Sequence, residues 1–316
     1  MYLKVRTIFI KVVFHTLGVA GKVFIRILMS KRQLVFLFHD INNKPSEFVK
    51  SANIYIDEAM FQNQIHWISS NFRIVNPREL TAPNWSGSAI ITFDDGFRSY
   101  KSTAFPLMKE IRIPSLLFVN KETINGGVNS SALARYIQMT QQLDNNWQDS
   151  NPDDYLNSIK QLSAAEVSDI KLFQGSYLSI DDLTEISKEE LVTIGSHLDN
   201  HWYAPSLKCE DLESSIKSNA EFVCSFDNGS NWLAMPHGVL SEQNLKKIRS
   251  IYQGPIFLGK GYKEMGNRKN LISRVDMSDK LTSELILIGA VLWNVMRRQR
   301  RITHANSNCS CYECLK

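Results

Sequence analysis

Short apolar runs alternate with amphipathic stretches along most of the chain. Apolar runs typical of buried strands lie at 34–38, 73–75, 88–93, 113–119, 191–196, 231–235, 256–258 and 271–276. Helical periodicity lies between them, at 57–70, 102–112, 181–189, 210–225 and 241–250. Strands that alternate with helices form parallel sheets. The pattern therefore predicts an α/β fold with a parallel, barrel-like sheet.

One long segment, 120–180, separates two of the predicted strands. It is rich in Asn, Gln, Ser and Asp and shows some helical periodicity at 153–172. Two interpretations stay open, a surface excursion or a lid or substrate wall near the strand ends.

Two adjacent carboxylates, Asp94 and Asp95, follow the apolar run 89–93. A buried carboxylate is costly unless a cation or hydrogen bonds compensate it. If the two share one site, their repulsion separates their pKa values, and a metal on one leaves the other free as a base. A polar turn closing a strand accounts for the pair equally well on its own.

Four histidines also follow apolar runs. His197 and His201 come after 191–195, and a spacing of four places both rings on one helical face or within reach in a tight loop. Neutral imidazole is a common zinc ligand, although surface histidines show the same spacing. His39 and His237 occupy similar positions. Since catalytic groups gather at the carboxyl ends of strands in α/β barrels, we expect the four to converge.

Two segments carry a family resemblance. Thr92–Gly96 reads T-F-D-D-G, and Ile194–His201 reads I-G-S-H-L-D-N-H. Both resemble motifs of the metal-dependent polysaccharide deacetylases, carbohydrate esterase family four. The resemblance spans roughly residues 34–277 and implies a distorted (β/α) barrel of about seven strands.

The resemblance also implies site roles. Asp95, His197 and His201 would hold a divalent metal, with zinc preferred to other transition metals, and Asp94 would act as the general base. The substrate would be a carbohydrate that carries an N-acetyl or similar N-acyl group.

Two further motifs depart from the family pattern. The usual R-x-P-Y-G has Ala234 in place of Arg and His237 in place of Tyr. In the family that Arg orients the catalytic Asp, and Arg274 is the candidate replacement. A backbone N–H near His237 would stabilise the oxyanion. The motif L-x-H-D, usually near the C-terminus, occurs instead at Leu37–Asp40, which resembles a circularly permuted branch and makes His39 the general acid, with Asp40 to orient it.

Charge is distributed unevenly. Residues 1–39 carry seven Lys or Arg and no acid, and 297–316 carry five and one, which leaves 24 basic and 31 acidic residues between them. This acidic middle does not fit a nucleic-acid-binding face. A polar stripe that includes Lys4, Lys11 and Lys22 on an apolar helix favours a membrane surface, the alternative being a helix packed on the barrel.

The C-terminal region repeats this theme. The run 285–296 is mostly apolar but too short to span a membrane, and four arginines lie within 297–301. It either attaches to anionic lipid or closes the domain as a terminal helix. Cys309, Cys311 and Cys314 lack a clear fourth ligand and are expected in a disordered tail. Five cysteines, an odd number, indicate a reducing compartment.

These observations give a division into a basic amphipathic segment 1–33, a catalytic domain 34–280 with the insertion 120–180, and a C-terminal region 281–316. The predicted function is metal-dependent hydrolysis of an N-acyl group on a sugar, glycan or lipid precursor in cell-surface polysaccharide metabolism. The predicted location is the cytoplasm, at the inner membrane surface through the basic termini. The alternative is a non-catalytic, membrane-attached carbohydrate-binding or scaffold protein of the same fold.

Overall fold

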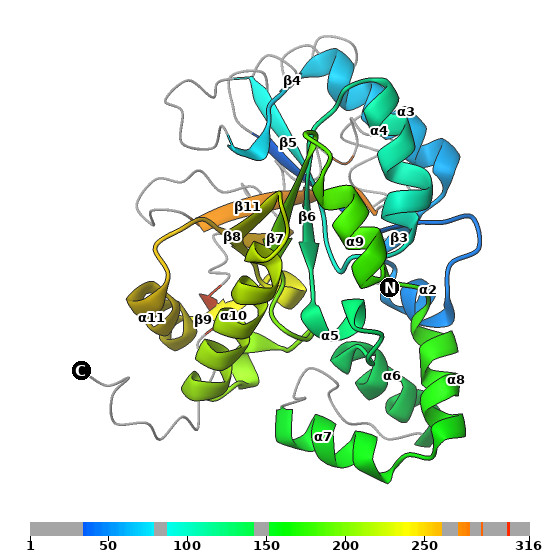
Figure 1. The fold of residues 1–316 in the computed structure, drawn as a ribbon, viewed down its shortest axis with the longest axis vertical. Coiled ribbons are helices and arrows are strands. Elements are labelled where there is room, and N and C mark those ends of the chain that lie inside the picture. The colour runs from blue at the N-terminus through cyan, green and yellow to red at the C-terminus, as the bar shows by residue number, and fades with distance from the viewer. Residues whose placement is uncertain are drawn as a thin grey trace, which may run out of the picture.

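Seven parallel strands close into a barrel in the computed structural model, which describes residues 34–78, 87–141, 152–260, 271–278, 286 and 302–303 (Figure 1). Going around the barrel, they are β1 (Leu34–Phe38), β11 (Leu271–Asp276), β10 (Ile256–Lys260), β8 (Gly229–Ala234), β7 (Val192–Ser196), β6 (Ser115–Val119) and β5 (Ser88–Phe93). β5 pairs with β1 and closes the ring. An eighth strand, β4 (Arg73–Ile74), pairs with the start of β5. The predicted barrel is confirmed, and no predicted strand end is displaced by more than two residues.

The helices predicted between the strands are also present. They are α3 (Glu58–Asn71), α4 (Phe105–Glu110), α9 (Ile180–Ser187), α10 (Cys209–Cys224) and α11 (Glu242–Ile251). Side chains of Asp57, Ser179 and Ser241 accept backbone N–H groups at the starts of α3, α9 and α11. α4 is shorter than predicted because the chain before it, Tyr100–Ala104, winds as a π-helical turn.

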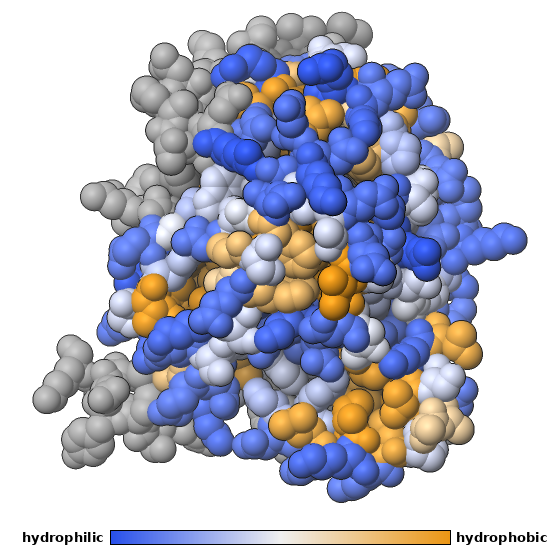
Figure 2. Space-filling view, viewed as in Figure 1, coloured by the Kyte–Doolittle hydropathy of each residue, from blue (hydrophilic) through white to orange (hydrophobic). Residues whose placement is uncertain are grey.

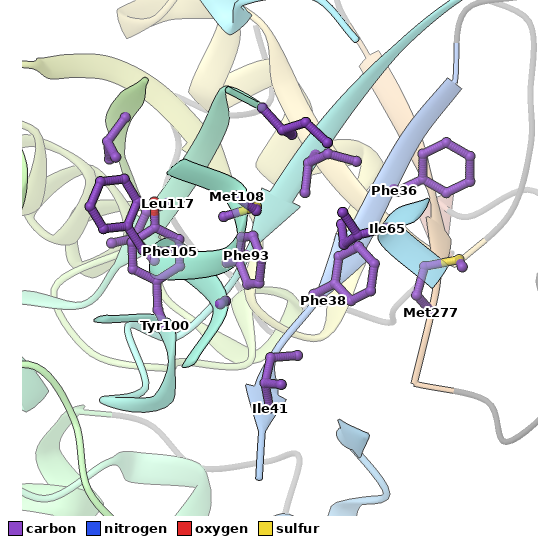
Figure 3. Packing of buried hydrophobic residues seen from close by; sticks show 14 of the residues in the cluster. Phe36, Phe38, Ile41, Ile65, Phe93, Tyr100, Phe105, Met108, Leu117 and Met277 are labelled. Carbon is purple, nitrogen blue, oxygen red and sulfur yellow. The ribbon is translucent and has the colours of Figure 1, made fainter. Parts of the chain in front are cut away.

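An aromatic cluster lies between β1, β5 and α3. Phe38 stacks on Phe93 with ring centroids 5.4 Å apart, and Figure 3 shows both residues among the buried side chains of this cluster. Phe38 also meets Phe61 edge-on at 5.2 Å. All residues of β1 and β5 are buried. Since side chains in such a core are close-packed, the strand ends just beyond Phe38 and Phe93 have a rigid base.

The described parts of the segment 120–180, which are 120–141 and 152–180, are largely helical. They contain α5 (Lys121–Ile124), α6 (Ser130–Gln141), α7 (Pro152–Gln161) and α8 (Ala164–Gln174), and then the start of α9. α6, α7 and α8 lie together at one end of the barrel, and α2 (Glu47–Ala52) packs against α6 and α8 (Figure 1). Figure 2 shows apolar side chains at this end, where Met139, Leu156 and Leu172 are exposed.

Two small pairs of strands complete the description. β2 (Asp40–Ile41) pairs with β3 (Tyr55–Ile56), and β9 (Leu240–Ser241) pairs with β12 (Ile302–Thr303). The predicted N-terminal helix in 1–33, the apolar run 285–296 apart from Ile286, and the cysteine tail lie outside the described residues. Within the described residues, no helix combines the length and apolar character needed to cross a membrane.

Candidate metal centre

A pocket of about 630 Å³ opens at the carboxyl ends of the barrel strands. Its walls come from the strand ends, from the α2 region and from α6 in the 120–180 segment. The residues singled out from the sequence all line it: His39, Asp94, Asp95, His197, His201, His237 and Arg274. The structure thus brings together side chains that lie up to 235 positions apart in the chain, and it makes part of the insertion a wall of the site.

Asp95, His197 and His201 form the centre of this pocket. Oδ1 of Asp95 lies 3.3 Å from Nε2 of His197 and 3.3 Å from Nε2 of His201, and one ligand atom from each residue lies within 4.8 Å of the others. Asp95 Oδ1 is buried and has no hydrogen-bond partner among the described residues. Burial alone would raise the pKa of Asp95, but the two imidazoles hold it well below its usual range.

The other nitrogen of each imidazole is held from behind. Nδ1 of His197 lies 3.0 Å from the carbonyl oxygen of Ala234, which makes it the N–H donor. Nδ1 of His201 lies 2.8 Å from Oγ of Ser131. Both Nε2 atoms can therefore present lone pairs toward Asp95, as second partners of metal-bound histidines commonly arrange. Burial lowers the pKa of His201 to about 4, so this ring is neutral at pH 7.

Two imidazole nitrogens and one buried carboxylate oxygen without a hydrogen bond fit a divalent transition metal such as zinc. The histidine spacing arises from a tight loop and not from a helix. In this loop Leu198 has a left-handed φ of 62°. Asp95, in the turn after β5, also has a left-handed φ, of 73°. Asn120 donates to the carbonyls of His197 and Leu198 and holds the strained loop in place.

Asp94 lies beside this cluster and has a different environment. Arg274 donates from Nη1 and Nη2 to its two carboxylate oxygens, both at 2.6 Å. Arg274 is 1% exposed, and its Nε donates to the carbonyl of Leu258 at 2.9 Å. Burial raises the pKa of Asp94, but Arg274 and His197 outweigh it and keep the carboxylate ionised. Oδ2 of Asp94 lies 3.8 Å from Nε2 of His197, next to the ligand cluster.

The family described as "Polysaccharide deacetylase" matches residues 83–252, more than half of the chain. The chain belongs to the polysaccharide deacetylase family. No curated protein matches it significantly.

Solved structures of deacetylases share its fold. BC0361, a polysaccharide deacetylase from Bacillus cereus, is 14% identical over 82% of this chain and 68% of its own, with a TM-score of 0.56. The deacetylase PplD of Streptococcus pyogenes, solved with acetate, is 15% identical over 81% and 97%, with a TM-score of 0.56. IcaB from Ammonifex degensii is 17% identical over 82% and 95%, with a TM-score of 0.54. At these identities the likeness shows the fold alone.

Two site residues of this deacetylase lie outside the family match. They are His39, which follows β1, and Arg274 on β11. β1 lies inside the barrel as predicted, with Phe38 in register with Phe93, so that His39 and Asp94 leave neighbouring strands at the same height. The family's usual arginine is absent at Ala234, and the guanidinium that meets Asp94 comes from β11 instead. The permuted motif order stays a prediction.

The expected role of Asp40 is wrong. Asp40 was expected to orient His39, but its Oδ1 accepts a hydrogen bond from Oγ of Ser99 at 2.5 Å, and Nδ1 of His39 is buried without a hydrogen-bond partner among the described residues. Side chains of successive residues in extended chain point to opposite sides. Asp40 begins β2 and faces Ser99, while His39 lines the pocket.

The third motif forms a strained turn in this deacetylase. His237 has a left-handed φ of 57° and Gly238 a φ of 65°. A Cβ on Gly238 would lie 2.1 Å from backbone atoms of Gly259, so glycine is required there. The His237 ring lies 4.6 Å from the ring of His201, between centroids, which places it at the edge of the ligand cluster.

Sequence reasoning left open that the segment 120–180 forms a wall of the site, but it did not identify the residues of α6 that do so. Ser131 and Arg135, four residues apart and therefore on one face of the helix, both line the pocket. The only signal was Asn129-Ser130-Ser131, a group of residue types that favour helix starts. Such a signal predicts a helix but not what the helix contacts.

Proposed function

We propose that this deacetylase hydrolyses the N-acetyl, or a similar N-acyl, group of a sugar and depends on a divalent metal, with zinc preferred. The observation that carries the proposal is Oδ1 of Asp95, a buried acceptor without a hydrogen bond in the described structure, facing two imidazole nitrogens at 3.3 Å. An ionised carboxylate in this setting calls for a cation.

Asp95, His197 and His201 would hold the metal. When bound, such an ion lowers the pKa of water and polarises an acyl carbonyl. Asp94, ionised and oriented by Arg274, would accept a proton from the attacking water as general base. A backbone N–H near His237 would donate to the oxyanion.

His39 would complete the reaction as general acid. Water oxygen bonds to the acyl carbon, the carbon–nitrogen bond breaks, and the departing amine takes a proton from the His39 imidazole. The carboxylic acid is the second product. His39 lines the same pocket as Asp94, and its buried Nδ1 makes no hydrogen bond within the described structure. The ring is therefore not committed to a structural hydrogen bond through this nitrogen, which supports a catalytic role.

The non-catalytic alternative lost its main argument. It was based on the missing arginine of the third motif, which would leave the base unoriented. Arg274 supplies two hydrogen bonds to Asp94 from another strand, which supports catalysis.

The proposal is tested by metal content and by acetate release. The double variant His197→Ala/His201→Ala should lose the metal and its activity on a panel of N-acetylated nucleotide-linked, lipid-linked and polymeric sugars, while its circular dichroism stays unchanged. His66→Ala on α3, an exposed histidine, is the matched control. Chelation should abolish activity and zinc should restore it. A double variant that retains stoichiometric metal would contradict the proposal.

We also propose a peripheral location at the inner membrane surface in cell-surface polysaccharide metabolism. The support is the acid-free, lysine-striped N-terminal sequence. Deleting residues 1–30 should abolish sedimentation with anionic vesicles at low salt, where surface electrostatics are strongest. Full-length protein that ignores such vesicles would contradict it.

A further inference from the structure

The start of α6 contacts the candidate metal centre through a single hydroxyl. Oγ of Ser131 lies 2.8 Å from Nδ1 of His201, 3.1 Å from the carbonyl oxygen of His201 and 3.2 Å from Nε2 of His237. Ser131 is 2% exposed. No other side chain of the described insertion makes a hydrogen bond to a ring of the ligand cluster.

The hydrogen-bonding capacity of serine fixes the direction of these contacts. A hydroxyl has one donor and two acceptor positions. The carbonyl of His201 can only accept, so the Ser131 O–H donates to it. Oγ can then accept the N–H of Nδ1 of His201, while the His237 ring has a hydrogen-bond partner of its own in the backbone of His201. This assignment leaves Nε2 of His201 with a free lone pair toward Oδ1 of Asp95.

Backbone contacts hold Ser131 rigidly against the histidine. Oδ1 of Asn200 accepts the backbone N–H of Ser130 at 2.9 Å and that of His201 at 2.7 Å, which links the start of α6 to the ligand loop. Oδ1 of Asn129 accepts the N–H of Ser131 at 2.9 Å. The hydroxyl is therefore positioned by the same amide that positions the ligand.

We propose that Ser131 is a positioning residue of the metal centre that selects the metal-binding tautomer and ring orientation of His201. The inference rests on the proposed Asp95, His197 and His201 site. His197 obtains the equivalent support from the barrel itself, through the carbonyl of Ala234. His201 depends on a side chain from the 120–180 segment, so the docking of this segment sets part of the metal affinity.

The test compares Ser131→Ala with Ser130→Ala in the full chain. Ser130 is adjacent and equally buried, but its Oγ makes no hydrogen bond within the described structure, which makes it a matched control. Loss of an outer partner of a metal-binding histidine typically costs about 10–100-fold in affinity. Competition with a chelator should show zinc binding weakened by that factor in Ser131→Ala and little changed in Ser130→Ala. Ser131→Thr, which keeps the hydroxyl, should restore it.

A second readout separates positioning from folding. Nitrogen-15 NMR of the apoprotein should show the Nδ1–H tautomer of His201 in the wild type and a mixture of tautomers in Ser131→Ala. Wild-type zinc affinity in Ser131→Ala would overturn the inference, as would equal losses in both serine variants. His201→Ala distinguishes the two proposals: if it retains zinc the metal site itself is wrong, whereas if it loses zinc while Ser131→Ala does not, only the role of Ser131 is wrong.

Discussion

Asp94 and Asp95 are neighbours in the chain, equally buried at 3% exposure, and yet have opposite surroundings. The charge of Asp94 is compensated within the chain, since Arg274 donates two hydrogen bonds of 2.6 Å to it. We call Asp94, Arg274 and the neighbouring Thr92 the closed region. We call Asp95, His197 and His201 the open region. Oδ1 of Asp95 faces the two imidazole nitrogens at 3.3 Å and has no hydrogen-bond donor in good geometry among the described residues.

The difference shows how one strand end can supply two chemical functions. A buried ionised group needs a compensating charge. β11 supplies that charge to Asp94 through Arg274, whereas the loop after β7 offers Asp95 the imidazoles of His197 and His201. We infer that Asp94 is thereby reserved for proton transfer and Asp95 for an external cation.

Exchanging each carboxylate for an amide tests this division most strongly. Asp94→Asn should lower kcat by about 10²–10⁴-fold, because an amide cannot accept the proton from water, and it should retain the metal. Asp95→Asn should lose the metal. Steady-state kinetics and metal analysis measure both. If Asp94→Asn loses the metal instead, the two roles are reversed, and if it keeps near-normal kcat, Asp94 is not the base.

His39→Ala tests whether His39, like Asp94, acts in proton transfer and not in metal binding. Amine departure without its proton should lower kcat at the lower end of the same range, about 10²-fold, with metal content unchanged. An aryl acetate, whose leaving group needs no proton, should be hydrolysed at close to the wild-type rate. Equal losses on the amide and the aryl ester would show that His39 has a structural role.

Arg274→Gln removes the guanidinium that compensates Asp94 in the closed region. Removing one partner of a buried ion pair costs about 3–5 kcal/mol, so the free energy of unfolding at pH 7 should fall by roughly this amount. In the wild type Arg274 and His197 lower the pKa of Asp94, so its contribution to stability is present above about pH 4 and is lost at lower pH.

The pH dependence of that variant has the opposite sign. Without Arg274, burial raises the pKa of Asp94, so the carboxyl takes up a proton as the pH falls and the stability deficit shrinks. Urea unfolding of the apoprotein at pH 7 and pH 5 measures the change. A deficit that is the same at both values would show that Asp94 is not the group left unpaired.

Thr92→Val gives the smallest expected effect. Oγ1 of Thr92 donates to the carbonyl of Phe36 at 2.9 Å and lies 3.5 Å from Nη1 of Arg274, deep in the closed region. Its loss should lower the free energy of unfolding by about 0.5–1.5 kcal/mol and leave zinc affinity unchanged. A clear loss of zinc affinity in this variant would show that the two regions are coupled.

The barrel was predictable because its strands are short apolar runs that end at polar residues. In β5 the run Ala89–Phe93 is buried on both faces, and the sequence shows it as an apolar stretch in which Thr92 is the single polar residue. Parallel strands place their carboxyl ends together, so the convergence of Asp95, His197 and His201 followed from the same pattern.

Contacts set by docking were not predictable. The role expected for Asp40 failed because the alternation of β2 turns this carboxyl toward Ser99. Ser131 reaches His201 only because the Asn200 amide ties α6 to the ligand loop, and nothing in the local sequence encodes that meeting. Arg274 was a candidate because it lies in a predicted strand and the family's usual arginine is missing at Ala234, but its two hydrogen bonds to Asp94 depend on where β11 lies in the barrel.

The position of β11 has a consequence for biosynthesis. Arg274 leaves the ribosome 180 residues after the aspartate it neutralises, and β11 pairs with β1, the first described strand. Until β11 arrives, a nascent barrel that buried Asp94 would enclose an uncompensated charge, which opposes premature compaction. We therefore expect a nascent chain stalled before residue 271 to leave the β1 and β5 amides open to hydrogen exchange, and to protect them once β11 has emerged.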